Sequence, residues 1–97
     1  MTRDDAMATL RAHATEIASL GVRRLAVFGS VARGEDTARS DIDILVAFDG
    51  GATFDRYFDL KFRLEDLLGR PVDLVSESAL RPELAPDVKR EALYVTP

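Results

Sequence analysis

Two aspartates, Asp41 and Asp43, stand one residue apart at the start of the apolar run DIDILVAF. Residues two apart in a strand point to the same face and lie about 6.6 Å apart by the strand rise. Two carboxylates held this way repel each other, and burying them without a compensating charge is costly. The pattern therefore indicates a cation between them. Divalent magnesium prefers such oxygen ligands and keeps positions open for phosphate oxygens.

A third acid, Asp73, lies in the later apolar segment PVDLVS. If that strand pairs with the one that begins at Asp41, Asp73 joins the other two acids. Three carboxylates can hold two metal ions roughly 3.5–4 Å apart, the arrangement used for in-line displacement at phosphorus. We therefore expect Asp41, Asp43 and Asp73 to be metal ligands and catalytic residues, with Asp73 as the candidate for activating the acceptor. The alternative for Asp73 is a solvated residue at the edge of the sheet.

The segment GSVARG, just before these acids, is suited to binding an anion. Gly29 lets the chain turn tightly after an apolar run. Ser30 offers a hydroxyl and a backbone amide, and a helical turn after it would direct further amides at a phosphate. Gly34 lets the backbone leave that turn. The segment is not a P-loop, because no Lys-Ser/Thr pair follows the glycine.

Two more residues near the acids admit two interpretations each. Arg33 is placed to reach phosphate oxygens, but it could instead form a surface ion pair with Glu35 or Asp36, which would contribute little. Ser40 stands directly before Asp41. It either contacts the ligand or, in the interpretation we favour, braces the loop ahead of the strand.

Helices are predicted from the spacing of apolar residues over residues 4–20 and 53–68. Thr53 is the expected N-cap of the second helix and Gly69 its stop. A short helix interrupted by Pro86 is expected over residues 82–92. Four aromatic residues of the second helix indicate core or, because they spread around more than one face, an apolar patch for a partner: Phe54, Tyr57, Phe58 and Phe62.

Strands are predicted over residues 25–28, 41–48 and 72–75, with a short last edge strand in LYV. The order of the elements describes an α/β (α+β) domain, a small mixed sheet of about four strands flanked by helices. At 97 residues, the chain is expected to form one domain over residues 1–97 with one modest core.

Composition excludes several classes of protein. The chain has no cysteine, so it has neither a disulfide framework nor a thiolate metal site. Its net charge of −4 does not favour duplex DNA or RNA as a partner. The first twenty residues do not have the pattern of a signal peptide, and no later run is long and apolar enough for a membrane span. The cytoplasm is the expected compartment.

The stretch GSVARGEDTARSDID, together with the later PVDLV, resembles the signature of the DNA polymerase β-like nucleotidyltransferase superfamily. The short chain is similar to its minimal nucleotidyltransferases (MNT). The positions that match are Gly29, Ser30, Arg33, Gly34, Ser40, Asp41, Asp43 and Asp73. The resemblance implies the DNA polymerase β-like nucleotidyltransferase fold and a magnesium-dependent transfer of a nucleotide, usually AMP from ATP, with two Mg²⁺ ions. It also implies that Gly29 and Ser30 contact the triphosphate and that the three aspartates bind metal.

The resemblance also implies a partner. Members of the MNT group are commonly the antitoxin of a HEPN/MNT toxin–antitoxin pair, so a HEPN-type toxin is the expected partner and a tyrosine hydroxyl on it the expected acceptor. The rival hypothesis is an antitoxin that neutralises its partner by binding alone, with little or no catalysis. Transfer to a small molecule or to RNA is less favoured, because such enzymes usually carry a further domain for the acceptor.

Overall fold

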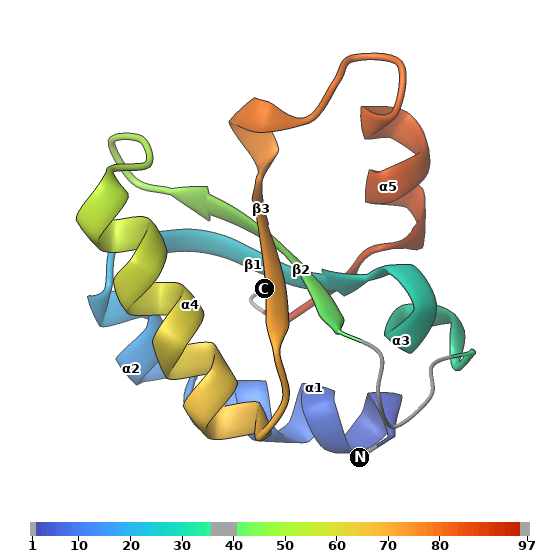
Figure 1. Cartoon of the computed structure of the whole chain (residues 1–97), viewed down its shortest axis with the longest axis horizontal. Coiled ribbons are helices and arrows are strands. Elements are labelled where there is room, and N and C mark those ends of the chain that lie inside the picture. Colours follow the sequence, from blue (N-terminus) through green and yellow to red (C-terminus); the bar gives the residue numbers. More distant parts are fainter. Residues whose placement is uncertain (1, 36–40, 96–97) are drawn as a thin grey trace.

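The computed structural model, which describes residues 2–35 and 41–95, contains a four-stranded mixed sheet (Figure 1). Its strands lie in the order β3-β2-β1-β4. They are β1 (Val22–Phe28), β2 (Ile42–Phe48), β3 (Val72–Ser76) and β4 (Leu93–Tyr94). β1 pairs antiparallel with β2 and β4, whereas β2 and β3 run parallel. The predicted mixed sheet of about four strands, including the short last edge strand, is confirmed.

Helices cover this sheet and fill the connections between strands. They are α1 (Arg3–Ala12), α2 (Ala14–Ser19), α3 (Gly29–Arg33), α4 (Phe54–Leu68), the 3₁₀ turn η1 (Glu77–Ala79) and α5 (Ala85–Glu91). Figure 1 shows α1, α2 and α4 gathered on one side, with α5 apart from them beside α3. Within the described ranges, no helix has the length and apolar character of a membrane span.

The core lies between the sheet and α1, α2 and α4. Alternate residues of the strands point into it, as the period of two requires. Its fully buried side chains include Leu10, Ile17, Leu25, Val27, Ile42, Ile44, Val46, Leu60 and Leu64. Leu45, on the opposite face of β2, is also buried. The turn η1 contacts β2, and α5 contacts the neighbouring strand β1. Both faces of the central strand are therefore covered beyond its first residues.

The predicted ends of the long helix are confirmed. The Thr53 hydroxyl accepts a hydrogen bond from the Arg56 amide (3.2 Å) at the start of α4. Gly69 follows the helix in the left-handed conformation (φ 66°), which only glycine adopts without strain. The chain then turns directly into β3, so the end of α4 lies close to the start of that strand.

Three elements differ from their predictions. The helix over residues 4–20 is two helices, because the His13 ring contacts the Thr9 carbonyl (2.9 Å) and the His13 amide bonds to Leu10 instead. β1 begins earlier than residue 25, with Arg23 and Arg24 directed to solvent. Pro86 does not interrupt the last helix but stands in its first turn, where no amide donor is required.

Candidate functional site

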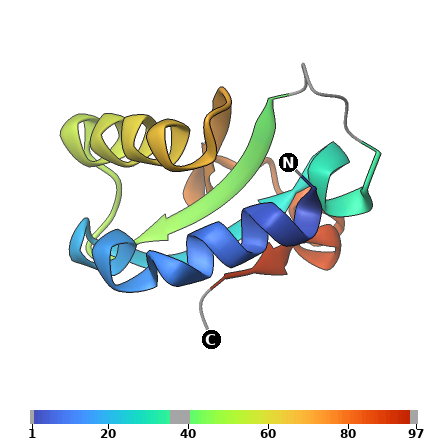
Figure 2. The ribbon, with the colours of Figure 1, turned by 90° about the horizontal axis from the view of Figure 1, so that it is seen from below.

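Asp43 and Asp73 occupy opposite positions in neighbouring strands. The parallel register of β2 and β3 pairs Asp43 with Asp73, so both side chains leave the same face of the sheet. The two carboxyl groups lie close enough to share a hydrogen bond. The structure therefore brings these two predicted site residues together. They stand where β2 and β3 begin, at the end of the sheet where β1 passes into α3 (Figures 1 and 2).

The pKa of the Asp43 carboxyl is raised above its ordinary value. Burial is the largest cause, because it removes water from the ionised form, and the charges of Asp73 and Asp41 and the hydrogen bond with Asp73 add to it. The positive charge of Arg33 acts in the opposite direction. The chain therefore compensates this negative charge only in part, and a set of carboxylate oxygens suits a hard divalent cation.

Gly29 allows the Asp43 carboxylate to lie against the backbone. Phe28 stands opposite Asp43 in the antiparallel ladder of β1 and β2, and Gly29 follows with a φ of 70°. A Cβ at this position would overlap Oδ2 of Asp43. Both the left-handed backbone and the close approach therefore require glycine here.

Ser30 and Gly34 lie at the two ends of α3. Ser30 is half-buried in the first turn of this short helix, directly after the glycine that contacts Asp43. Gly34 ends the helix in the left-handed conformation (φ 72°), with its amide directed to the carbonyls of Ser30 and Val31. The predicted helical turn is thus present, and it begins beside the carboxylate pair.

Arg33 forms ion pairs in this structure. Its Nε lies 3.0 Å from Oε2 of Glu35 and its Nη1 lies 3.2 Å from Oε2 of Glu91. The side chain is 44% exposed, so these pairs stabilise the fold little and can rearrange around a ligand. The pair with Glu35 is the alternative that the sequence offered, and Glu91 is an addition from the far end of the chain. The charge of Arg33 still acts on Asp43.

The structure says less about the remaining predicted site residues, Asp41 and Ser40. Asp41 is exposed, directly before β2, although its charge is felt by Asp43. Ser40 and Asp36 lie outside the described residues. Among the residues that are described, no three His, Cys, Asp or Glu side chains are grouped as metal ligands. The three-carboxylate metal site therefore stays a prediction, and the structure brings together two of its three acids, Asp43 and Asp73.

The outer edge of β3 is held by a row of α4 side chains that sequence reasoning missed. Tyr57 donates its hydroxyl to the Leu74 carbonyl (2.6 Å), and Lys61 donates to the Val72 carbonyl (2.6 Å). Glu65 accepts from the Val72 amide (2.9 Å). These three side chains recur every four residues along one side of the helix. We call them the edge clamp.

The edge clamp fixes the strand that carries Asp73. β3 is an outer strand of the sheet, and its outward backbone groups would otherwise be open to water or to another chain. Bonding at Val72 and Leu74 holds the backbone on either side of Asp73. The sequence signal was the i, i+4, i+8 spacing of Tyr57, Lys61 and Glu65, but their backbone partners in β3 could not be known before the packing of α4 on that strand.

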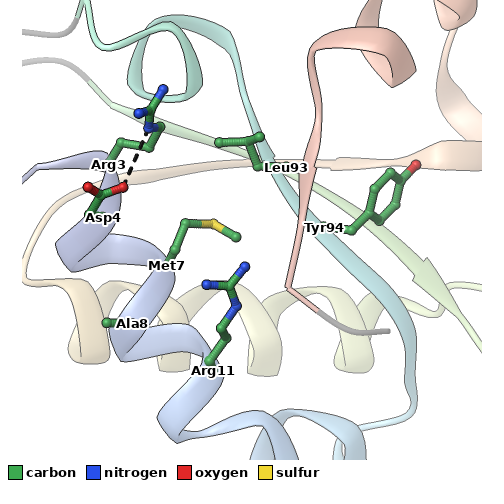
Figure 3. Close-up of a pocket in the computed structure, with 7 residues that line it drawn as sticks. All are labelled: Arg3, Asp4, Met7, Ala8, Arg11, Leu93 and Tyr94. Carbon is green, nitrogen blue, oxygen red and sulfur yellow. Dashed lines mark ion pairs between the residues drawn. The ribbon is translucent and has the colours of Figure 1, made fainter.

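The cavities of the described structure lie elsewhere. One of about 540 Å³ lies between α1 and β4 (Figure 3). Arg3 and Arg11 line it from α1, Leu93 points toward α1, and the Tyr94 ring points away. A second, of about 300 Å³, lies near the far end of β2 and η1. Neither of these two cavities is lined by any predicted site residue.

A family model described as "Nucleotidyltransferase domain" matches residues 10–95 of the chain. Among curated proteins, a protein of Thermococcus cleftensis named protein adenylyltransferase MntA is 42% identical over 96 residues. That alignment covers 98% of this chain and 97% of the relative. The similarity therefore extends over nearly the whole of both proteins.

Solved structures show the same fold. One, described as a minimal nucleotidyltransferase, is 46% identical, with a TM-score of 0.85 and 96% of this chain and 95% of that chain covered. Another contains a tri-AMPylated Shewanella oneidensis HEPN toxin in complex with its MNT antitoxin. It is 18% identical, with a TM-score of 0.67 over 93% of this chain and 71% of that chain. At that identity the likeness shows the fold alone.

Proposed function

This chain belongs to the nucleotidyltransferase domain family, and from that premise we propose that it is an antitoxin that transfers AMP from ATP to a hydroxyl group of a HEPN-type toxin. The observation that carries the proposal is the Asp43–Asp73 pair beside the Gly29 turn. The name of the Thermococcus cleftensis relative supports protein adenylylation. The MNT–HEPN complex of the same fold, with its AMPylated toxin, supports the partner. We expect the reaction to take place in the cytoplasm.

The reaction is an in-line displacement at the α-phosphorus of ATP. The acceptor oxygen, which we expect to be that of a tyrosine, forms a bond to this phosphorus, and the bond to the β-phosphate oxygen breaks, so that pyrophosphate leaves. Asp73 is exposed on an outer strand and is the carboxylate that an approaching hydroxyl can reach. We assign it the role of receiving the hydroxyl proton.

The carboxylate set fits a divalent cation. Asp43 and Asp73 present oxygen ligands side by side. The pKa of Asp43 is raised first by burial and then by the negative charges of Asp73 and Asp41. We assign the metal site to Asp41, Asp43 and Asp73. Two Mg²⁺ ions bound there would neutralise phosphate charge and lower the pKa of the attacking hydroxyl.

The nucleotide is assigned to the turn between β1 and α3. Gly29 and Ser30 stand beside the carboxylate pair, where a hydroxyl and backbone amides can hold phosphate oxygens. Arg33 would exchange its surface ion pairs for a phosphate contact, and Gly34 would keep the turn in shape. Ser40 completes the assigned set as a brace for the loop before Asp41.

Intact-mass measurement tests the proposal. A HEPN-type protein, sought in the neighbouring reading frame, is incubated with this protein, ATP and Mg²⁺, and an Asp41→Ala/Asp43→Ala variant is run in parallel. We expect mass increments of one or more adenylyl groups with the wild type and none with the variant. A circular dichroism melt of the variant shows that it is folded.

Two results would contradict the assignment. A fully active double variant would show that the acids do not carry the reaction. A tight complex without any mass increment would support the rival function, neutralisation by binding alone.

A further inference from the structure

An aromatic ridge runs along the exposed side of α4. It consists of Phe54, Phe58 and Phe62, one residue per turn, with ring centroids 4.7 Å and 5.8 Å apart. Phe54 is 77% exposed and Phe62 is 57% exposed. Neighbouring aromatic rings, tilted against one another and this exposed, are typical of a surface that another protein covers.

The ridge adjoins the outer edge of β3. Phe58 contacts the Tyr57 ring edge to face, with centroids 5.0 Å apart, and Tyr57 donates to the Leu74 carbonyl. Figure 1 shows α4 and β3 side by side. A protein that covers the ridge is thereby brought next to the strand that carries Asp73.

The border of the ridge is acidic. Asp55, Asp59 and Asp66 are exposed, and at 100° per residue they fall together on the side of the ridge away from the core. Neither Asp55 nor Asp59 forms an ion pair within the described part of the chain. Their charges are therefore available to a partner.

The basic residues of α4 are engaged inside the fold instead. Arg56 donates to the carbonyls of Asp49 and Gly51, Lys61 donates to Val72, and Arg63 pairs with Glu16. Of the three acids, only Asp66 acts on one of these basic residues, Arg63, so Asp55 and Asp59 carry the uncompensated charge of the border. Charge complementarity therefore selects a partner with basic residues around an apolar patch.

We infer that the aromatic ridge and its acidic border form the docking surface for the acceptor protein, whose matching surface is apolar with a basic rim. The inference rests on the proposed function for the identity of that partner. Docking here delivers the acceptor hydroxyl along β3 toward Asp73. A second copy of this chain fits less well: it carries the same charge of −4, and antiparallel packing of two ridges about a two-fold axis places both acidic borders on one side.

Titration calorimetry with the HEPN-type protein tests the surface. The variant Phe54→Ser/Phe62→Ser removes the two most exposed rings and leaves the half-buried Phe58 in place. We expect its Kd to be at least about tenfold higher, because exposed aromatic anchors carry much of the energy of an interface. The matched control is Leu84→Ser, which removes a side chain that is 50% exposed on another segment, and its Kd should equal that of the wild type.

Charge reversal tests the acidic border separately. Asp55→Lys/Asp59→Lys should weaken binding and reduce its dependence on salt. Unchanged affinity in both the ring variant and the charge variant would overturn the inference. So would a wild-type dimer in light scattering that the ring variant loses, because the ridge would then belong to a second copy.

The two proposals fail in different ways. If the wild type adenylylates its partner and the ridge variants bind and transfer normally, the docking inference is wrong and the proposed function stands. If binding depends on the ridge but no adenylyl group appears, the docking surface stands and the transferase assignment fails. If no complex forms and no adenylyl group is transferred, both are wrong.

Discussion

The carboxylate of Asp43 lies against the backbone of Gly29, in space that a Cβ at that glycine would fill. The contact joins the two halves of the site, because Gly29 begins the phosphate-binding turn assigned above and Asp43 belongs to the carboxylate pair. Displacing either residue should therefore disturb both halves.

Gly29→Ala should abolish adenylyl transfer and destabilise the fold. The left-handed backbone alone costs about 1–2 kcal/mol with a side chain, and the new Cβ must also displace the Asp43 carboxylate. Gly69→Ala is the matched control, because Gly69 has a similar φ of 66° but open space around it. Urea denaturation and transfer assays on both variants separate backbone strain from the displacement of Asp43. Equal activity in the two would show that the contact is unimportant.

Asp43→Asn should raise the stability of the metal-free protein at neutral pH. The pKa of the Asp43 carboxyl is raised in the folded state. The stability that this carboxyl contributes is therefore fully present below its unfolded-state pKa of 3.8 and is lost as the pH rises through the folded-state pKa. At a partly exposed site the gain is about 1 kcal/mol or less. Thermal melts in EDTA measure it.

Mg²⁺ should reverse the order of stability of the wild type and Asp43→Asn. A cation that binds only the folded state stabilises it by mass action, so millimolar Mg²⁺ should raise the melting temperature of the wild type more than that of Asp43→Asn. Equal shifts would argue against a metal site at Asp43.

Lys61→Met should loosen the strand that carries Asp73. The substitution keeps the length of the side chain but leaves the Val72 carbonyl without its 2.6 Å donor, at a cost of about 1–3 kcal/mol. If the edge clamp positions Asp73, Mn²⁺ titration should also show weaker metal binding. Lys89→Met is the control, because Lys89 has only a 3.8 Å pair with Glu77. A loss of stability without any change in metal affinity would limit the clamp to a structural role.

Glu16→Gln should lower stability at neutral pH but not in acid. The hydrogen bond from Arg63 lowers the pKa of Glu16, so the stabilisation is present above the ordinary value of 4.5 and disappears as the pH falls through the lowered pKa. Melting curves of the wild type and the variant should therefore differ at pH 7 and converge in acid, below the lowered pKa of Glu16. Curves that stay parallel over this range would show that the ion pair does not join α2 to α4.

Features that depend only on neighbouring residues, such as helix ends and tight turns, could be predicted from the sequence. Thr53 and Gly69 end α4 as expected, since a cap and a left-handed stop depend on neighbouring residues only. The period of two in DIDILVAF predicted Asp41 and Asp43 on one face of a strand, but in the structure only Asp43 lies in β2 and Asp41 stands directly before it. The Gly29–Ser30 turn and its helical continuation were predictable for the same reason.

Tertiary structure decided the relations that join distant segments. The register that sets Asp43 opposite Asp73 is a pairing of two strands 30 residues apart along the chain. The pair between Arg33 and Glu91 and the bonds of the edge clamp likewise join segments that only the packed fold brings together.

The aromatic residues of α4 show most clearly what the sequence pattern alone could not predict. The sequence left Phe54 and Phe58 as either core or part of an apolar patch. In the structure Phe54 is exposed, and the buried positions of the helix are Leu60, Leu64 and Leu68. Periodicity identifies which residues share a side of a helix but not how wide a stripe the sheet covers. That width depends on where the helix rests on the sheet, so the sequence determined the apolar pattern and the tertiary structure decided which part of it remains open to a partner.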